Sequence, residues 1–463
     1  MKVAIIVDNG FLTLWQYNSL KLASNLVDIK LILNCKNTIT KRNYIKYFVY
    51  YVINFLFIRN KHSVKILINN KFSKSKLFDF ESHYFDNRQH LPKETLEIIK
   101  NEKIELIIKF GMNLLNVDNI DKVVKNGAIS FHHGDPSKYR GRPAGFYEIL
   151  NKENYIGIVV QRLKNSIDNG KIIAFAQSKV FPYSYKKTIL NTFSNSKYLL
   201  KKALLNILDN KSYNLQYSKK LYSLPNNYLS VFFLFLIFKN CFERIIYGLF
   251  FEKKWNVSIK TINFKEILMN DFKHLKVEKK AYFHHKYKFY ADPFFLDKDT
   301  IVVEAFDKKT NKGALVSLKS SNLEYLKDIV NDSKKHFSYP FTYSFNNEEF
   351  ILPEVGSWSN QFLIKNSNNE IVFLKGLQDY SLIDPTYFLY DNIHYIFAGL
   401  KNESLDKLYI FYSLDSFLGH YKEHKQNPVN INPMNSRMGG KIIEYQNKLY
   451  RIGQNILHHM AMV

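Results

Sequence analysis

The sequence has little cysteine and no long uninterrupted apolar run. Only Cys35 and Cys241 occur, far apart in the chain, so a disulfide framework is excluded and a reducing compartment is favoured. The first residues read as a strand and not as a charged segment followed by an apolar core and a cleavage site, so no secretory signal is apparent. These absences predict a cytoplasmic protein.

Two apolar stretches, 47–58 and 228–238, are both shorter than the ~20 residues that a helix needs to span a bilayer. Extending the second stretch toward Phe251 crosses Lys239, Glu243 and Arg244. We therefore expect these segments to pack between domains, or to lie on the inner surface of a membrane, with packing favoured.

The chain carries a strong excess of positive charge. Its formal net charge is +25, which attracts polyanions such as tRNA, an anionic membrane face or a phosphorylated sugar. The lysines are scattered through the chain and form no basic arm. This distribution argues against a dedicated nucleic-acid site.

A Gly-x-Gly-x-x-Gly dinucleotide fingerprint is absent after the first β-rich run. Short β-rich runs nevertheless alternate with helical stretches through the first part of the chain, which predicts an α/β domain with a mostly parallel sheet. The runs are 3–7, 29–33, 64–68 and 105–110, and the helical stretches are 12–26 and 93–100.

A polar constellation follows this pattern. Side chains alternate across a strand, so Ser130 and His132 of the run 127–132 point to the same side. Two further β-rich runs, 156–163 and 171–177, are joined by a turn that contains Asp168. That turn can bring a carboxylate back beside the imidazole.

Three pieces of this region, Ser130-Phe131-His132, Lys138-Tyr139-Arg140-Gly141 and Asp168-Asn169-Gly170, resemble the folate-dependent formyltransferases. That family, which includes methionyl-tRNA, glycinamide ribonucleotide and sugar N-formyltransferases, has an Asn-x-His, a loop closing in Tyr-Arg-Gly and an Asp-x-Gly turn. The resemblance covers residues 1–184 and implies a Rossmann-like α/β domain with formyltetrahydrofolate as donor.

By this resemblance, His132 and Asp168 are the catalytic candidates. Formyl transfer passes through a tetrahedral intermediate, in which an imidazole can donate to the oxyanion while a carboxylate holds the ring and takes the amine's proton. Ser130 stands where the family has Asn, and its shorter hydroxyl reaches an oxyanion only through water. A different one-carbon or acyl donor, or a decayed site, therefore stays open.

The resemblance also implies binding residues. The folate donor is expected against Phe110, Gly111 and Met112, and the substrate against Tyr139 and Arg140, whose guanidinium suits a phosphate or carboxylate.

Taken separately, the catalytic pieces also fit an ordinary strand end and an Asp-Asn-Gly hairpin turn. A metal site at 132, 133 and 135 is disfavoured, because adjacent strand residues point apart, and we expect no metal.

From residue 255 onward the pattern becomes β-rich and repetitive. Asp-Pro or Tyr-Pro pairs begin successive copies, and the prolines at 293, 340 and 385 lie 47 and 45 residues apart, a period that suits one four-stranded propeller blade. A looser fourth copy begins at Gly439. Only four copies are visible, so the predicted five-bladed-propeller-like domain is expected to be open, shortened or closed by earlier strands.

Four acidic residues occupy related positions in these copies: Asp292, Glu304, Glu354 and Asp384. Because equivalent positions of successive blades face one channel, these carboxylates should converge, raise one another's pKa and suit acid/base work or sugar binding. Capping of inner-strand turns is the alternative. This half resembles the propeller-like domain of glucosamine inositolphosphorylceramide transferases, and also the five-bladed furanosidases.

The predicted organisation is thus a formyltransferase-like domain in 1–184, a helical connector in 185–254 and a propeller-like domain in 255–463. The leading hypothesis is an N-formyltransferase acting on a nucleotide- or lipid-linked amino sugar in surface glycan biosynthesis. The alternative is a propeller-based glycosyl transferase, hydrolase or glycan-binding protein with a degenerate formyltransferase-like domain.

Overall fold

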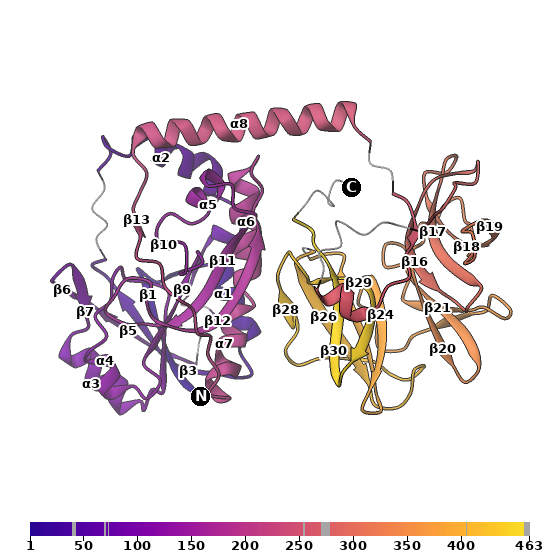
Figure 1. The fold of residues 1–463 in the computed structure, drawn as a ribbon. Coiled ribbons are helices and arrows are strands. Elements are labelled where there is room, and N and C mark those ends of the chain that lie inside the picture. Colours follow the sequence, from indigo (N-terminus) through magenta and orange to yellow (C-terminus); the bar gives the residue numbers. More distant parts are fainter. Residues whose placement is uncertain are drawn as a thin grey trace. The chain divides into compact units, whose positions relative to one another are not determined.

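The computed structural model describes residues 1–38, 43–68, 71–72, 74–252, 255–269, 278–403 and 405–457. The chain divides into two compact units, shown in Figure 1: unit 1 spans Met1–Leu249 and unit 2 spans Phe250–Val463. The segment 458–463, where the sequence offers no further repeat, lies outside the described residues.

Within the described residues, nine strands of unit 1 form one sheet. They are β1 (Lys2–Asp8), β2 (Phe11–Thr13), β3 (Asp28–Cys35), β4 (Lys65–Leu67), β5 (Lys76–Phe80), β8 (Leu106–Lys109), β9 (Ala128–His132), β11 (Tyr155–Arg162) and β12 (Lys171–Lys179). The centre is parallel, since β1 pairs with β3 and β8, β3 with β5, and β8 with β9. At one end β11 and β12 pair antiparallel beyond β9, and β2 and β4 form an antiparallel branch from β1, whereas the edge strand β5 is parallel.

The α/β class is confirmed, but the sheet is mixed and not mostly parallel. The run 64–68 forms an antiparallel edge strand, while the parallel neighbour of β3 is β5, which the pattern did not predict. Polar residues interrupt β5, so its apolar signal is weak. The helix predicted for 12–26 starts only at Leu14, because 11–13 pair as β2.

Helices cover both faces of the sheet. On one face α3 (Lys93–Asn101) and α4 (Ile120–Val123) place Ile99 and Ile120 in a core with Ala4 and Ile6. On the other face α1 (Leu14–Leu22) contacts α6 (Tyr185–Ser196) and α7 (Leu199–Leu208), which lie on β12. The first part of the predicted connector therefore belongs to the sheet domain.

A second helical layer completes unit 1. It comprises α2 (Phe48–Ile53), the π-helical turn η1 (Asn54–Ile58), the short turn η2 (Lys61–Ser63), α5 (Phe146–Leu150) and α8 (Asn227–Phe250). The inner face of α8 buries Phe233 against Phe146 and Tyr185. Among the described helices, none combines the length and the apolarity that crossing a membrane demands.

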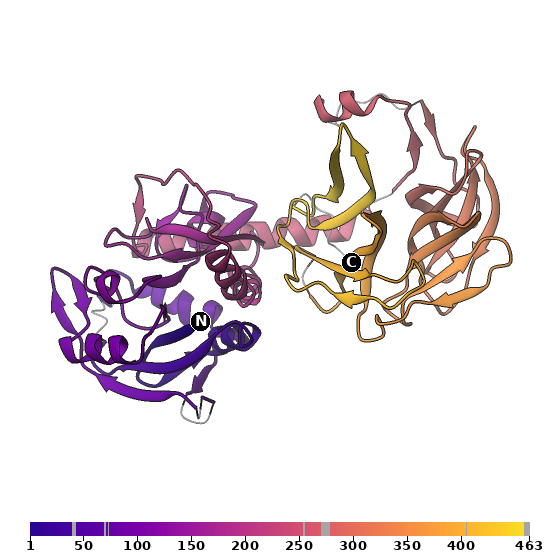
Figure 2. The ribbon, with the colours of Figure 1, turned by 90° about the horizontal axis from the view of Figure 1, so that it is seen from below.

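Unit 2 consists of antiparallel sheets, seen side by side in Figure 2. The first larger sheet has the strand order β16 (Tyr287–Phe295), β17 (Thr300–Asp307), β18 (Gly313–Lys319) and β19 (Tyr325–Val330). The second has the order β20 (Ser338–Phe345), β21 (Glu348–Glu354), β22 (Phe362–Lys365) and β23 (Ile371–Phe373). The third has the order β24 (Leu382–Tyr390), β25 (Ile393–Leu400), β26 (Lys407–Ser413) and β27 (Lys422–Glu423), and β28 (Asn430–Ile431) also pairs with β26. Hairpins β29 (Arg437–Tyr445) with β30 (Lys448–Gln454) and β14 (Ser258–Ile259) with β15 (Lys279–Lys280), together with α9 (Phe264–Met269), complete the described part.

The repeat predicted from sequence has a matching backbone feature. Asp292, Tyr339 and Asp384 all have positive φ, between 45° and 48°, each precedes a proline, and each lies at a register shift between the first two strands of its sheet. The first strands also neighbour one another, since β16 contacts β20, β20 contacts β24, β24 contacts β29 and β29 contacts β16. A closed propeller itself stays a prediction.

Candidate functional site

The imidazole of His132 and the carboxylate of Asp168 meet. His132 ends β9, Asp168 lies in the turn between β11 and β12, and Nδ1 of His132 is 3.4 Å from Oδ2 of Asp168. Pairing of β9 with β11 brings the two segments together, because Ser130 lies opposite Gln161 and His132 opposite Val159. The structure thus joins two residues that are 36 positions apart in the sequence.

Backbone and amide donors hold the carboxylate of Asp168. Gly141 N–H donates to Oδ2 at 2.8 Å and the Gln161 amide donates to Oδ1 at 3.3 Å. Asp168 itself has positive φ, 46°. Two hydrogen bonds and a strained backbone orient this group toward the imidazole, which is more than a solvated hairpin turn requires.

Arg140 fixes the same turn. Its guanidinium donates to the carbonyl oxygens of Ile167 and Ser218, with Nε at 3.1 Å from Ile167 O and Nη1 at 2.8 Å from Ser218 O. Three donors of Arg140 are thus occupied by backbone carbonyls, and its predicted role in substrate binding stays a prediction. Arg142, two residues on, is exposed.

Tyr139 is also committed to the protein. Its ring is buried, and its hydroxyl donates to Glu153 and accepts from Asn151. Its carbonyl oxygen lies 2.9 Å from Nε2 of His132. The side chain predicted to contact substrate thus stabilises the loop, while its backbone contacts the candidate catalytic ring.

His132 is nearly enclosed in this conformation, at 8 % exposure. The cavity beside it, lined by the loop 139–143 and by Tyr147, Glu148 and Tyr222, has a volume of about 10 Å³, enough for one water at most. Both ring nitrogens face acceptor oxygens, an arrangement that only an imidazolium satisfies in full. A reacting carbonyl reaches this ring only after Nε2 releases the Tyr139 carbonyl.

Ser130 and Lys109 occupy the same end of the sheet. The Ser130 hydroxyl donates to the carbonyl oxygen of Lys109 at 3.2 Å, so its proton is already engaged. Burial lowers the pKa of the Lys109 ammonium to about 8, against the opposing effects of Asp8 and Asp168. Across the described ranges, Lys109 Nζ has no hydrogen bond or ion pair. Lys109 was not predicted as a site residue, although a lysine ending an apolar strand was a visible signal.

The three residues expected to face folate have different surroundings in the structure. The Phe110 ring packs on Trp15 and Phe131 and stays partly exposed. A Cβ on Gly111 would lie 2.5 Å from the carbonyl carbon of Val7, so only glycine fits. Met112 points into the core of unit 1 and has positive φ. Only the Phe110 side chain therefore remains available to a ligand.

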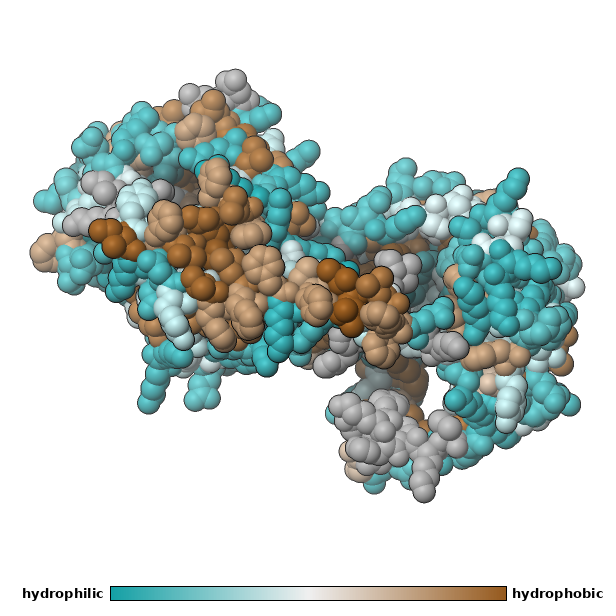
Figure 3. Space-filling view, turned by 90° about the horizontal axis from the view of Figure 1, so that it is seen from above, coloured by the Kyte–Doolittle hydropathy of each residue, from teal (hydrophilic) through white to brown (hydrophobic). Residues whose placement is uncertain are grey.

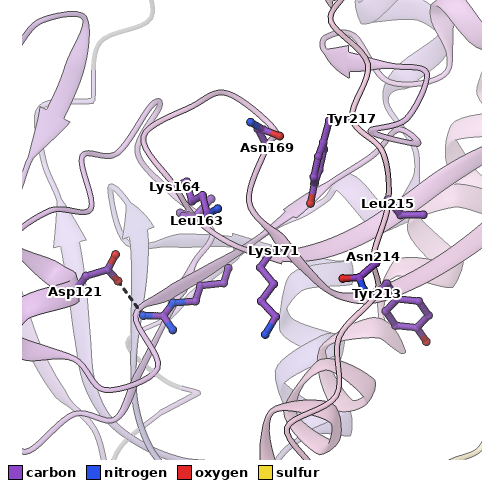
Figure 4. Close-up of a pocket in the computed structure, with 10 residues that line it drawn as sticks. Asp121, Leu163, Lys164, Asn169, Lys171, Tyr213, Asn214, Leu215 and Tyr217 are labelled. Atoms are coloured by element: carbon purple, nitrogen blue, oxygen red, sulfur yellow. Dashed lines mark hydrogen bonds and ion pairs between the residues drawn. The ribbon is translucent and has the colours of Figure 1, made fainter.

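A larger pocket of about 530 Å³ lies next to the Asp168 turn (Figure 4). It is lined by Asp121, Arg162, Leu163, Lys164, Asn169, Lys171, Tyr213, Asn214, Leu215 and Tyr217. Three of these side chains are cationic, and Arg162 pairs with Asp121 at 3.3 Å. Asn169, adjacent to Asp168, belongs to this pocket, so the turn contributes to both places. The sequence analysis did not predict this pocket.

The histidine and acid residues after β9 diverge, as the alternation of the strand predicts. His133 contacts Ser196 Oγ at 2.9 Å, and burial lowers its pKa to about 3. Asp135 accepts from the backbone and hydroxyl of Ser137. Over the described ranges, no group of three His, Cys, Asp or Glu residues is arranged to hold a metal ion.

In unit 2 the four predicted acidic residues share one electrostatic environment. Asp384, fully buried, is paired with the Arg437 guanidinium of β29, and its backbone N–H donates to Glu354 at 3.0 Å. Across the part of the chain that the structure describes, neither Asp292 nor Glu304 has a hydrogen bond, although Glu304 is only 8 % exposed. Arg437 was not predicted, and its place at the start of the fourth copy was the available signal.

Burial is the main cause of the shifted pKa values in this cluster. It raises the pKa of Asp292 to about 7, with Asp384 adding to the effect, and that of Glu354 to about 8. It raises the pKa of Glu304 well above its usual range, with Asp292, Glu354 and Asp384 contributing. Arg437 opposes all three shifts. The cluster therefore holds protonated carboxyl groups near neutral pH.

Comparison with known proteins gives two separate matches. Residues 32–203 match the family "Formyl transferase", and residues 275–461 match the family "Glucosamine inositolphosphorylceramide transferase 1, N-terminal". Glucosamine inositolphosphorylceramide transferase 1 of Oryza sativa subsp. japonica is 33 % identical over 184 residues, and that of Arabidopsis thaliana is 30 % identical over 185. Each alignment covers 36 % of this chain and 24 % of the relative, so the match spans about a quarter of those proteins.

Solved structures similar to the chain include two formyltransferases. Phosphoribosylglycinamide formyltransferase from Anaplasma phagocytophilum is 12 % identical, with a TM-score of 0.34, over 48 % of this chain and 97 % of that one. A sugar N-formyltransferase from Shewanella sp. is 14 % identical, with a TM-score of 0.30, over 48 % of this chain and 76 % of that one. By its family matches, the chain combines a formyl transferase domain in its first half with a glucosamine inositolphosphorylceramide transferase 1 N-terminal domain in its second.

Proposed function

We propose that the chain transfers a formyl group from formyltetrahydrofolate to the amine of a nucleotide- or lipid-linked amino sugar during surface glycan synthesis. The observation that carries the proposal is the 3.4 Å contact between His132 and Asp168, in a domain of the formyl transferase family. The name of the relatives of the second domain, which includes glucosamine, supports an amino sugar as the acceptor. The reaction would take place in the cytoplasm, at the inner membrane surface if the carrier is a lipid.

In the proposed reaction the amine nitrogen attacks the formyl carbon, and the bond from that carbon to the folate nitrogen breaks. Asp168 accepts the proton that the amine loses, directly or through water, and the folate nitrogen takes up a proton as it leaves. His132 turns from the Tyr139 carbonyl and donates to the oxyanion of the tetrahedral intermediate. The cations of the 530 Å³ pocket, Arg162, Lys164 and Lys171, would hold the phosphates of the carrier.

The test is incubation of the full chain with formyltetrahydrofolate and a panel of amino-sugar nucleotides, with mass spectrometry for the addition of one formyl group. We expect a formamide product from the wild type, a faster reaction from Ser130→Asn, which restores the amide donor of the family, and loss of product in His132→Gln. Absence of product from both the wild type and Ser130→Asn would overturn the proposal.

A second candidate function rests on unit 2. We propose that its sheets belong to a propeller whose acidic cluster binds or cleaves a glycan. The carboxyl groups of Asp292 and Glu304 support this, because within the described residues they make no hydrogen bond, although His336 Nε2 lies 3.8 Å from Glu304 Oε1. Alanine at Asp292 would then abolish glycan binding or turnover, while His132→Gln would leave both intact. Equal glycan binding by the wild type and Asp292→Ala would exclude this function.

A further inference from the structure

Unit 1 carries a broad apolar surface outside both candidate sites. Helix α8 exposes ten large apolar residues, and seven of them follow alternating spacings of three and four, which align on one side of a helix. The segment 45–58, containing α2 and η1, exposes five more beside it. We name these residues the α2–α8 face: Ile45, Phe48, Val52, Phe55, Leu56, Tyr228, Val231, Phe235, Phe238, Phe242, Ile245 and Leu249.

The two helical segments of this face are fixed to one another. The side chain of Asn227 accepts from Val49 N–H at 3.1 Å and donates to the Ile45 carbonyl at 2.8 Å. Phe233 and its neighbours fill the core beneath α8. The outward residues are therefore not spare core residues, and several are almost fully exposed, with Ile45 at 89 % and Tyr228 at 82 %.

Figure 3 shows apolar side chains gathered along α8 and the adjoining helical segment. Monomeric proteins rarely expose contiguous apolar patches beyond a few hundred Å², and larger ones mark interaction sites. The patch spans two helices side by side, which gives a flat surface and not a single narrow seam.

Charge identifies the partner. The segment 43–61 contains Lys46, Arg59 and Lys61 and no acidic residue, while α8 adds Lys239 and Arg244 against one Glu243. The guanidinium of Arg59 lies over the Phe55 ring at 4.3 Å, so cation and apolar surface are adjacent. Aromatic residues bordered by cations are the composition of helices that lie in the plane of an anionic membrane.

A second copy of the chain would also cover an apolar helix, and the three–four spacing on α8 suits such pairing. The net charge of +25 opposes it, because two like-charged chains repel. We propose that the α2–α8 face docks unit 1 onto an anionic lipid bilayer, with α8 and α2 lying in the plane of the surface.

The experiment is co-sedimentation of the full chain with vesicles of phosphatidylcholine alone or mixed equally with phosphatidylglycerol. We expect strong binding to the mixed vesicles, weakened by salt, and little to phosphatidylcholine alone. Phe235→Gln with Phe242→Gln should lower the partition to mixed vesicles about tenfold or more. The matched control, Phe85→Gln with Leu208→Gln, removes two exposed apolar residues elsewhere in unit 1 and should bind as the wild type does.

A charge-reversal pair, Lys46→Glu with Arg59→Glu, should also reduce binding without touching the core, and circular dichroism establishes that each variant is folded. Failure of the wild type to bind mixed vesicles, or equal binding by the Phe235/Phe242 variant, would overturn the proposal. A lipid-free dimer in sedimentation velocity, lost in that variant and unaccompanied by vesicle binding, would assign the face to a second copy instead.

Discussion

At the candidate site, the contacts of individual residues fix both the position of each side chain and the charges that surround it. Asp168 accepts two hydrogen bonds and still faces His132, while Lys109, near two carboxylates, makes no ion pair with any residue that the structure describes. Substitutions that keep the shape and remove the charge therefore separate chemistry from folding at this scale.

For Asp168, the informative substitution is Asp168→Asn. Asparagine keeps an acceptor for Gly141 N–H but removes the negative charge beside the imidazole and the proton acceptor. We expect kcat for the proposed formyl transfer to fall about 10²–10⁴-fold with little change in thermal stability. Steady-state kinetics and a melting curve measure both. Wild-type kcat in this variant would reduce the carboxylate to a turn-forming role.

For Lys109, the informative substitution is Lys109→Met. The folded-state pKa, about 8, lies below the ordinary 10.5, so the folded chain binds fewer protons between these values and stability rises with pH across that window. Removing the buried charge should stabilise the protein by about 1–3 kcal/mol at pH 7 and flatten the rise. Urea unfolding at several pH values tests this, with exposed Lys93→Met as control. An unchanged pH dependence would contradict it.

At the scale of elements, the site depends on a two-residue pairing between β10 (Arg140–Gly141) and β13 (Leu221–Tyr222). Gly141 has φ of 97°, and a Cβ there would lie 2.1 Å from the Tyr222 carbonyl oxygen. The same residue donates to Asp168. This two-residue ladder therefore couples the packing of residues 221–222 to the turn that holds the candidate catalytic Asp168.

We expect Gly141→Ala to destabilise unit 1 by about 1–3 kcal/mol or more and to displace the Asp168 turn. Gly10→Ala is the matched control, because Gly10 also has positive φ, 76°, but a Cβ there meets nothing within 4 Å. Urea unfolding of both variants gives the comparison. Equal losses would show that backbone strain alone, and not the clash with Tyr222, sets the cost.

At the scale of the whole molecule, the acidic cluster of unit 2 makes the stability of the protein depend on pH. Unit 2 concentrates carboxyl groups whose pKa values are raised, to about 7 for Asp292 and about 8 for Glu354, above the ordinary 3.8 and 4.5. The folded state therefore holds protons that the unfolded chain has lost between about pH 4 and pH 8. Its stability must fall as pH rises through that window.

Calorimetry of the full chain should accordingly show the transition of unit 2 moving to lower temperature between about pH 5 and pH 8. Glu354→Gln, which keeps an acceptor for the Asp384 N–H, should flatten that dependence, while the exposed Glu324→Gln should not. A transition that is equally steep in the two variants would mean that other groups govern the acid response.

Much of the fold was predictable because it depends on local patterns. Apolar runs located β1, β3, β8, β9, β11 and β12, and the proline spacing located β16, β20 and β24. β5 and the antiparallel edges were not predictable, because strand pairing joins segments that the sequence keeps apart. The same reason explains why Lys109, Arg437 and the pocket of Figure 4 were missed.

The sequence alone determined which residue types stand at these positions: an imidazole at the strand end at 132, a carboxylate in the turn at 168, and acids or a tyrosine before the repeated prolines. Tertiary structure decided what they contact. It placed Asp168 against His132 and engaged Arg140 and Tyr139 in contacts within the protein. Among the residues that the structure describes, it left Lys109 and Glu304 without hydrogen bonds. The physical reason is that hydrogen bonding and desolvation depend on distance in space, which a sequence fixes only after its strands have paired.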